Sequence, residues 1–167
     1  LTKEFNDVYN LINNTNINLF ITGKAGSGKS TLLEYFRQKT NKNFVTLAFQ
    51  GITAIKAKGQ TLHSFFKFGP HFLAKEEIKL LKDKSLIQNL DTILIDEISM
   101  VRADLFDAID MSLKKNRKNN KPFGGVQMIV FGDVMQIDPI VGSSDEEMME
   151  KFYPKGRFFF NSNIYEK

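Results

Sequence analysis

The chain has 167 residues, of which 42% are hydrophobic and 25% charged, and this balance fits one folded domain and argues against disorder. It contains no cysteine, which excludes disulfides and thiolate metal sites, and two histidines are too few for a histidine-rich metal centre. The net charge of +4 permits a polyanionic partner without requiring one. The N-terminus is unlike a signal peptide and no apolar run approaches the ~20 residues of a membrane span, so we expect a cytoplasmic protein without membrane contact.

Short apolar runs alternate with amphipathic stretches along the chain, and this alternation predicts an α/β fold with a mostly parallel sheet. The expected strands are 18–22, 44–49, 92–95, 126–131 and 158–160. Helices are expected at 5–13, 29–39 and 104–115, and 74–90 is expected to be mostly helical, with Ile78, Leu81 and Leu86 facing inward. The segments 116–125 and 138–145 are predicted to be surface loops. A basic run is expected to form a solvated helix end: Lys114, Lys115, Arg117, Lys118 and Lys121.

The segment Gly23-Lys24-Ala25-Gly26-Ser27-Gly28-Lys29-Ser30 fits the pattern G-x-x-x-x-G-K-[ST] and lies between an expected strand and an expected helix. Glycines in this pattern allow positive φ, so that backbone N–H groups can wrap around phosphate oxygens. The helix N-terminus adds positive potential, Lys29 reaches the β- and γ-phosphates, and the Ser30 hydroxyl can ligate Mg²⁺. The predicted ligands are ATP and Mg²⁺, and the predicted nucleotide-binding residues are Gly23, Gly26, Ser27, Gly28, Lys29, Ser30 and Thr31. The alternative is a glycine-rich turn that only caps a helix.

Two carboxylates, Asp96 and Glu97, follow the expected strand 92–95. Asp96 is expected to hold Mg²⁺ together with Ser30, and Glu97 is expected to orient and deprotonate the attacking water. Neighbouring side chains at a strand end point to different sides, so the two carboxylates can divide these roles. The alternative is that one of them only caps the next helix.

The expected strand 126–131 is followed by Gly132 and Gln136. Gly132 is expected to allow a sharp turn, and the amide of Gln136 has a donor and an acceptor with which to sense a γ-phosphate and its water. The alternative is a polar loop without a role. The predicted catalytic residues are therefore Lys29, Glu97 and Gln136.

Together these segments resemble the PIF family of DNA helicases, which belongs to superfamily 1 and is related to the helicase subunit RecD. The resemblance covers essentially the whole chain and includes four further strings: Gly59-Gln60-Thr61-Leu62-His63-Ser64-Phe65, Asp96-Glu97-Ile98-Ser99-Met100-Val101-Arg102-Ala103-Asp104, Pro122-Phe123-Gly124-Gly125-Val126-Gln127 and Gly132-Asp133-x-x-Gln136. It implies a three-layer RecA-like P-loop fold with helices on both faces of the sheet. It also implies that 1–167 is the first motor domain of a translocase that moves 5′ to 3′ on single-stranded DNA. The residues implied to face the DNA are Gly51, Lys58, Thr61, His63, Ser64 and Phe65.

The sequence departs from the family pattern at four places. Phe5 stands where the family has the glutamine that reads adenine, and Lys58 replaces a glycine. The family string Pro-Thr-Gly-Ile-Ala-Ala is Phe49-Gln50-Gly51-Ile52-Thr53-Ala54 in this chain, so Gln50 replaces the threonine that contacts phosphate. The string Gln-Leu-Pro-Pro-Val is Gln136-Ile137-Asp138-Pro139-Ile140, which adds a carboxylate to that loop.

We expect this chain to lack a second motor lobe. In the family, that lobe closes the ATP cleft and supplies an arginine finger, which contributes ~10³–10⁵ in rate in P-loop enzymes. The chain alone is therefore expected to bind nucleotide and to hydrolyse it slowly. The expected partners are single-stranded DNA and the C-terminal motor lobe of the same protein.

Two other functions remain open on the sequence. One is a nucleotide-gated binding module with weak catalysis, and the other is a P-loop kinase that phosphorylates a small acceptor. A kinase of this kind normally has a lid of clustered arginines. The arginines of this chain are not clustered in the sequence: Arg37, Arg102, Arg117 and Arg157.

Overall fold

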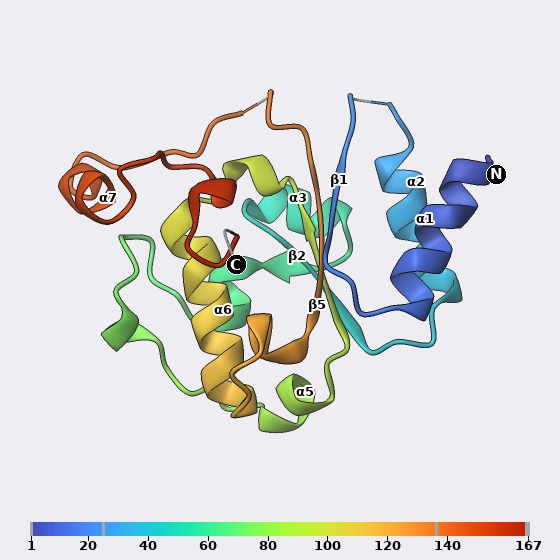
Figure 1. Cartoon of the computed structure of the whole chain (residues 1–167), viewed down its shortest axis with the longest axis horizontal. Helices are drawn as coiled ribbons and strands as arrows, with labels where there is room; N and C mark the ends of the chain where they lie inside the picture. The colour runs from blue at the N-terminus through green and yellow to red at the C-terminus, as the bar shows by residue number, and fades with distance from the viewer. Residues whose placement is uncertain (1, 25, 136, 166–167) are drawn as a thin grey trace.

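The computed structural model describes residues 2–24, 26–135 and 137–165. Its strands form one parallel sheet in the order β1-β5-β4-β2-β3 (Figure 1). The bounds are β1 (Leu19–Thr22), β2 (Phe44–Ala48), β3 (Gln60–Thr61), β4 (Thr92–Asp96) and β5 (Gln127–Gly132). All of β5 and all but the last residue of β4 are buried, as central strands of a parallel sheet are when helices cover both faces. The predicted parallel α/β fold is therefore confirmed.

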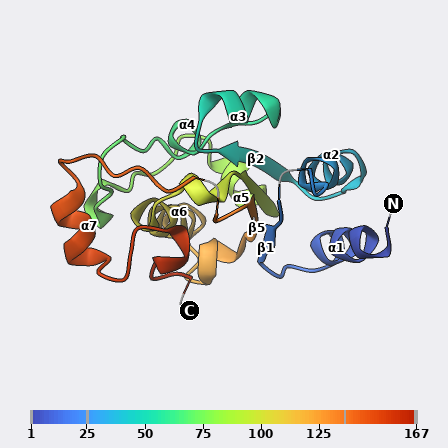
Figure 2. The same ribbon diagram turned by 90° about the horizontal axis from the view of Figure 1, so that it is seen from above.

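Helices lie on both sides of the sheet and form three layers with it (Figure 2). One face carries α1 (Lys3–Asn14) and α2 (Lys29–Lys39), which pack with residues of β4 and β5 in one apolar cluster. The larger cluster, on the other face, includes side chains of α4 (Leu62–Phe66), α5 (Lys84–Asn89) and α6 (Ala103–Arg117). The remaining helices are α3 (Gly51–Lys56) and α7 (Glu146–Phe152), and the 3₁₀ turns are η1 (Lys75–Glu77), η2 (Ile98–Met100), η3 (Pro122–Gly125) and η4 (Phe159–Asn161). Among the residues described, no helix combines the length and the apolar character needed to cross a membrane.

The stretch 74–90 is not mostly helical, so that prediction was wrong. It contains only the turn η1 and the short helix α5. Ile78 and Leu81 are buried as predicted, but Leu86 is 42% exposed. The apolar spacing therefore identified two buried residues correctly, although the segment that carries them is not a helix.

Side chains of α6 explain why this stretch does not need helical hydrogen bonds. Asn116 Oδ1 accepts from the Leu81 N–H at 2.7 Å, and Lys115 Nζ donates to the Ile78 carbonyl at 2.6 Å. Arg117 donates to backbone carbonyls at the end of α5. The basic run was expected to be solvated, but part of it satisfies the backbone of the neighbouring segment.

The predicted strand 158–160 was also wrong. Phe158 forms only an isolated antiparallel bridge, and the turn η4 follows it. The ring of Phe159 is fully buried, with its centroid 5.3 Å from that of Phe20 and 5.6 Å from that of Phe106. The run of aromatic residues therefore reflects the anchoring of one ring in the core.

Lys118 ends α6 in the left-handed backbone conformation, with φ of 52°. Because this conformation costs a residue with a Cβ about 1 kcal/mol, Lys118→Gly is expected to raise the free energy of unfolding by about 0.5–1 kcal/mol in urea denaturation. Lys39→Gly, in the last turn of α2, is the matched control and is expected to lower it by about 0.5 kcal/mol. A Lys118→Gly variant no more stable than the unmodified chain would contradict the prediction.

Candidate nucleotide-binding site

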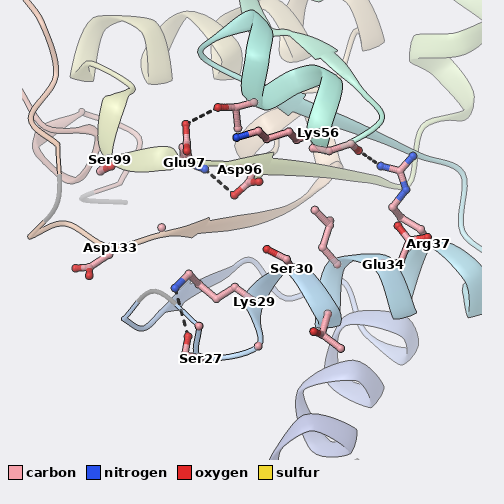
Figure 3. A pocket seen from close by; sticks show the side chains of 17 residues that line it. Ser27, Lys29, Ser30, Glu34, Arg37, Lys56, Asp96, Glu97, Ser99 and Asp133 are labelled. Atoms are coloured by element: carbon pink, nitrogen blue, oxygen red, sulfur yellow. Dashed lines mark hydrogen bonds between the residues drawn. The ribbon is translucent and has the colours of Figure 1, made fainter.

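A cavity of about 480 Å³ lies at the carboxyl ends of the central strands (Figure 3). Parallel strands present their carboxyl ends at the same edge of a sheet, which is where such folds bind ligands. The polar residues that line the cavity come from the glycine-rich loop, α2, α3 and the segments after β4 and β5: Ser27, Lys29, Ser30, Thr31, Glu34, Arg37, Thr53, Lys56, Asp96, Glu97, Ser99 and Asp133. The structure thus brings the glycine-rich loop and the predicted acidic pair together.

The glycines of the loop have two different reasons to be glycine. Gly26 and Gly28 have positive φ, 78° and 91°, and Gly28 is the N-cap of α2. At Gly23 the reason is space, because a Cβ would lie 2.6 Å from Ser27 Oγ. The predicted positive φ therefore holds for two of the three glycines, while Ala25 lies outside the described residues.

Lys29 begins α2, and its ammonium group folds back onto the loop. Its Nζ donates to the carbonyl of Gly23 and to that of Lys24 at 2.9 Å. It also donates to Ser27 Oγ at 3.3 Å (Figure 3). These bonds curl the loop around a positive charge. A phosphate oxygen would be a stronger partner for that charge than the neutral acceptors are.

Asp96 ends β4, and Glu97 follows it with positive φ of 54°. Burial raises the pKa of Asp96, partly opposed by the hydrogen bond from the Glu97 N–H at 2.9 Å, and the negative charge of Glu97 raises it further. A buried carboxylate beside a like charge is stabilised by a cation. Asp96 and the Ser30 hydroxyl line the same cavity and are oxygen donors, so they fit a Mg²⁺ ion.

Glu97 is the N-cap of η2, but its side chain makes no capping hydrogen bond. Its Oε2 accepts from the Thr53 hydroxyl at 2.7 Å, and the side chain lines the cavity (Figure 3). Left-handed backbone at a residue with a Cβ is strained and is often found at functional sites. The geometry therefore favours a role in the cavity over helix capping alone.

Gly132 was predicted to allow a sharp turn, but its backbone conformation is not one that requires glycine. It is the last residue of β5, and a Cβ there would lie 2.9 Å from Ile98 Cγ2, so the close approach of β5 to η2 requires glycine. Asp133 follows and lines the cavity. Gln136, the predicted sensor of the γ-phosphate, lies outside the described residues.

The contribution of α3 to this cavity was not predicted from the sequence. Thr53 and Lys56 line it from α3. Arg37 of α2 holds the end of α3, because its guanidinium donates to the carbonyl of Ala57 and, at 2.9 Å, to that of Lys58. The only signal in the sequence was Thr53, which stands at an alanine of the family string.

Three of the residues implied to face DNA lie at the carboxyl ends of β2 and β3. Gly51 is exposed and begins α3, which follows β2 after Phe49 and Gln50. Thr61 ends β3, opposite Ala48, and its hydroxyl accepts from the N–H of the exposed Ser64 at 3.1 Å. Three of the six residues therefore share one edge of the sheet.

The other three differ in how accessible they are. His63 is partly buried beside Phe49, and burial together with the charge of Arg102 lowers its pKa, so the ring is neutral at pH 7. Phe65 is only 8% exposed and packs in the core, so little of its ring is accessible to the DNA that it was implied to face. Lys58 is exposed but forms an ion pair with Glu34 of α2, which partly compensates its charge.

A second cavity, of about 280 Å³, adjoins the glycine-rich loop. It shares Ser27, Gly28 and Lys29 with the first and is otherwise lined by α1, α2 and β1, including Phe5. The ring of Phe5 lies edge-on to that of Tyr35, with the centroids 5.4 Å apart. Phe5, which stands at the position of the adenine-reading glutamine of the family, thus lines a cavity beside the glycine-rich loop.

The chain matches known proteins at the level of sequence. A family model described as PIF1-like helicase matches residues 1–154. The chain is 39% identical over 152 residues to the ATP-dependent DNA helicase Pif1 of Psychrobacter sp. (strain PRwf-1), a match that covers 83% of this chain and 22% of the relative. It is 35% identical over 162 residues to the ATP-dependent DNA helicase RRM3 of Saccharomyces cerevisiae, a match that covers 91% of this chain and 22% of RRM3. The chain thus spans about a fifth of the length of these relatives.

Solved structures of Pif1 helicases have the same fold as this chain. Pif1 from Bacteroides sp. in complex with ADP-AlF4 superposes with a TM-score of 0.88 at 40% identity, covering 99% of this chain and 39% of that chain. Pif1 from Candida albicans gives a TM-score of 0.81 at 31% identity, covering 99% and 37%. The three-layer RecA-like fold implied by the resemblance is therefore confirmed. On its sequence, fold and site, the chain belongs to the PIF1-like helicase family.

Proposed function

We propose that this chain is the nucleotide-binding motor domain of an ATP-dependent DNA helicase that moves 5′ to 3′ along single-stranded DNA. The observation that carries the proposal is that Lys29 and Ser30 of α2 line the same cavity as the acidic pair at the end of β4. Relatives named ATP-dependent DNA helicases, and structures of Pif1 from Bacteroides with ADP-AlF4 or with single-stranded DNA, support these ligands. A second motor lobe of the same protein is the proposed partner that closes the cavity.

Each cavity residue has a definite task in this proposal. The loop N–H groups and Lys29 bind phosphate oxygens, while Ser30 and Asp96 hold Mg²⁺, which when bound neutralises charge that develops on the phosphates. Glu97 accepts a proton from a water as that water forms a bond to the terminal phosphorus and the bond to ADP breaks. Gln136, which lies outside the described residues, is proposed to orient the same water.

The proposed DNA surface is the edge formed by the start of α3 and the start of α4. Gly51, Thr61 and Ser64 offer backbone and hydroxyl groups to the sugar-phosphate backbone, and His63 contributes as a neutral ring. Lys58 adds positive charge near the other end of α3. Phe65 is left out of the surface because it belongs to the core.

The kinase alternative is disfavoured by the positions of the arginines. Arg37 is engaged by carbonyls at the end of α3, and Arg117 by carbonyls near α5. Arg102 is buried and paired with Asp104 and Asp145. Three of the four arginines are therefore engaged in contacts that hold the fold, which disfavours a lid of arginines over a small acceptor.

Lys29→Ala is expected to weaken nucleotide binding by about 10- to 150-fold, because hydrogen bonds to a charged group contribute ~1.5–3 kcal/mol. The measurement is a titration with a fluorescent ATP analogue and Mg²⁺. Lys39→Ala, exposed at the far end of the same helix, is the control and is expected to leave the affinity unchanged. Equal affinities of the two variants would remove the phosphate site on which the proposal depends.

The same titration with and without a single-stranded oligonucleotide tests the helicase function against its alternatives. A motor domain is expected to bind nucleotide with a different affinity once DNA is bound, since the two sites share α3. A nucleotide affinity that does not change with DNA would favour the kinase or the nucleotide-gated module.

A further inference from the structure

We propose that Thr53 is a positioning residue for Glu97, through which the proposed DNA surface controls ATP hydrolysis. The proposal rests on the proposed function, in which Glu97 is the base. Thr53 is 6% exposed, and its hydroxyl donates to Glu97 Oε2 at 2.7 Å. No other side chain in the described part of the molecule is hydrogen-bonded to the Glu97 carboxylate.

The rest of Glu97 is already fixed, so this bond decides where the carboxylate points. The backbone is held at positive φ, and its N–H is bonded to Asp96 Oδ1. Thr53 is β-branched and buried within a helix, which limits its χ1 to two rotamers, and in the structure its hydroxyl is directed at Glu97. With Oε2 engaged by Thr53, Oε1 is left to accept a proton.

The helix that carries Thr53 connects the two functional surfaces. α3 begins at Gly51, in the proposed DNA surface, and Thr53 follows within the same turn. Arg37, from the helix that begins at Lys29, holds the other end of α3 through backbone carbonyls. A displacement of Gly51 by DNA therefore moves Thr53, and Thr53 moves the Glu97 carboxylate.

A merely structural role would have different consequences. The family string has alanine at this position, so the fold accommodates a side chain without a hydroxyl. If the hydroxyl only satisfied a buried polar group, its removal would lower thermal stability without changing turnover per folded molecule. The effect on turnover and on its dependence on DNA therefore separates positioning from stability.

The experiment compares Thr53→Val, which keeps the shape and removes the donor, with Thr53→Ser, which keeps the donor. The kcat and KM for ATP are measured on the intact protein with and without a saturating thymidine oligonucleotide. Thr53→Val is expected to lower kcat with DNA about tenfold, to leave KM within about twofold and to reduce the stimulation by DNA. Thr53→Ser is expected to stay within about threefold of the unmodified protein.

Thr92→Val is the matched control, because Thr92 is a buried threonine at the other end of β4 whose hydroxyl donates to Gln127 Oε1 at 2.9 Å. It is expected to lose thermal stability and to keep kcat and the stimulation by DNA. Unmodified kcat and stimulation in Thr53→Val would overturn this proposal and leave the proposed function standing. Absence of hydrolysis by the unmodified protein would overturn both. If Thr53→Val does not fold, Thr53→Ala against Thr53→Ser gives the same comparison.

Discussion

Replacing Glu97 by glutamine is expected to lower kcat for ATP hydrolysis by about 10²–10⁴-fold, the contribution of a positioned general base. Glutamine keeps the size of the side chain and an oxygen that can accept from Thr53, but it cannot take a proton from water. Nucleotide affinity is expected to change little, because Lys29 and the glycine-rich loop bind the phosphates. Steady-state hydrolysis with single-stranded DNA and a fluorescent-nucleotide titration measure the two quantities.

Glu147→Gln is the control for this substitution, because Glu147 is exposed on α7 and does not line the cavity. It is expected to leave both quantities unchanged. A kcat for Glu97→Gln within about threefold of the unmodified protein would contradict the assignment of the base. Asp133, which also lines the cavity, would then be the next carboxylate to replace.

Arg102→Met is expected to lower the free energy of unfolding by about 3–5 kcal/mol, because it leaves two buried carboxylates, Asp104 and Asp145, without their partner. The guanidinium donates to both oxygens of Asp104, at 2.8 and 2.7 Å, and to Asp145 Oδ2 at 3.1 Å. Asp104 is 0% exposed, so water cannot solvate its carboxylate once the guanidinium is removed. The network also joins α6 to the residue that precedes α7.

Urea denaturation measures this loss, with Arg157→Ala as the control. Arg157 is exposed, so removal of its side chain is expected to change the free energy of unfolding by less than about 0.5 kcal/mol. The double variant Arg102→Met/Asp104→Asn is expected to recover part of the loss, because it removes both charges and keeps an acceptor for the Leu73 N–H. A loss below about 1 kcal/mol in Arg102→Met would show that the buried pair matters little for stability.

The elements that build the cavity could be predicted because their signals are local. The helix 29–39 begins and ends where it was predicted, since a loop of fixed backbone geometry sets its start. The central strands are continuous apolar runs, which is typical of strands covered on both faces. β3 and α4 were too short to show a period, and in 74–90 a distant side chain, Asn116, replaces the local hydrogen bonds that a helix would form.

The site residues also divide into those with a local sequence signal and those that depend on a long-range contact. Lys29, Ser30, Asp96 and Glu97 could be placed together because each directly follows or begins a predictable element. Thr53 could not, because it meets Glu97 across 44 positions of sequence, and only the packing of α3 over the sheet brings them together.

The strand order has a consequence for how the chain acquires its structure during synthesis. β1 lies beside β5 in the sheet (Figure 1), although their paired residues are separated by about 110 positions. The glycine-rich loop follows β1, so its supporting strand has no neighbour until β5 has left the ribosome. Pairing at such sequence separation is slow, and the waiting apolar strand is prone to aggregation. We therefore expect nascent chains that stop short of β5 to depend on chaperones for solubility.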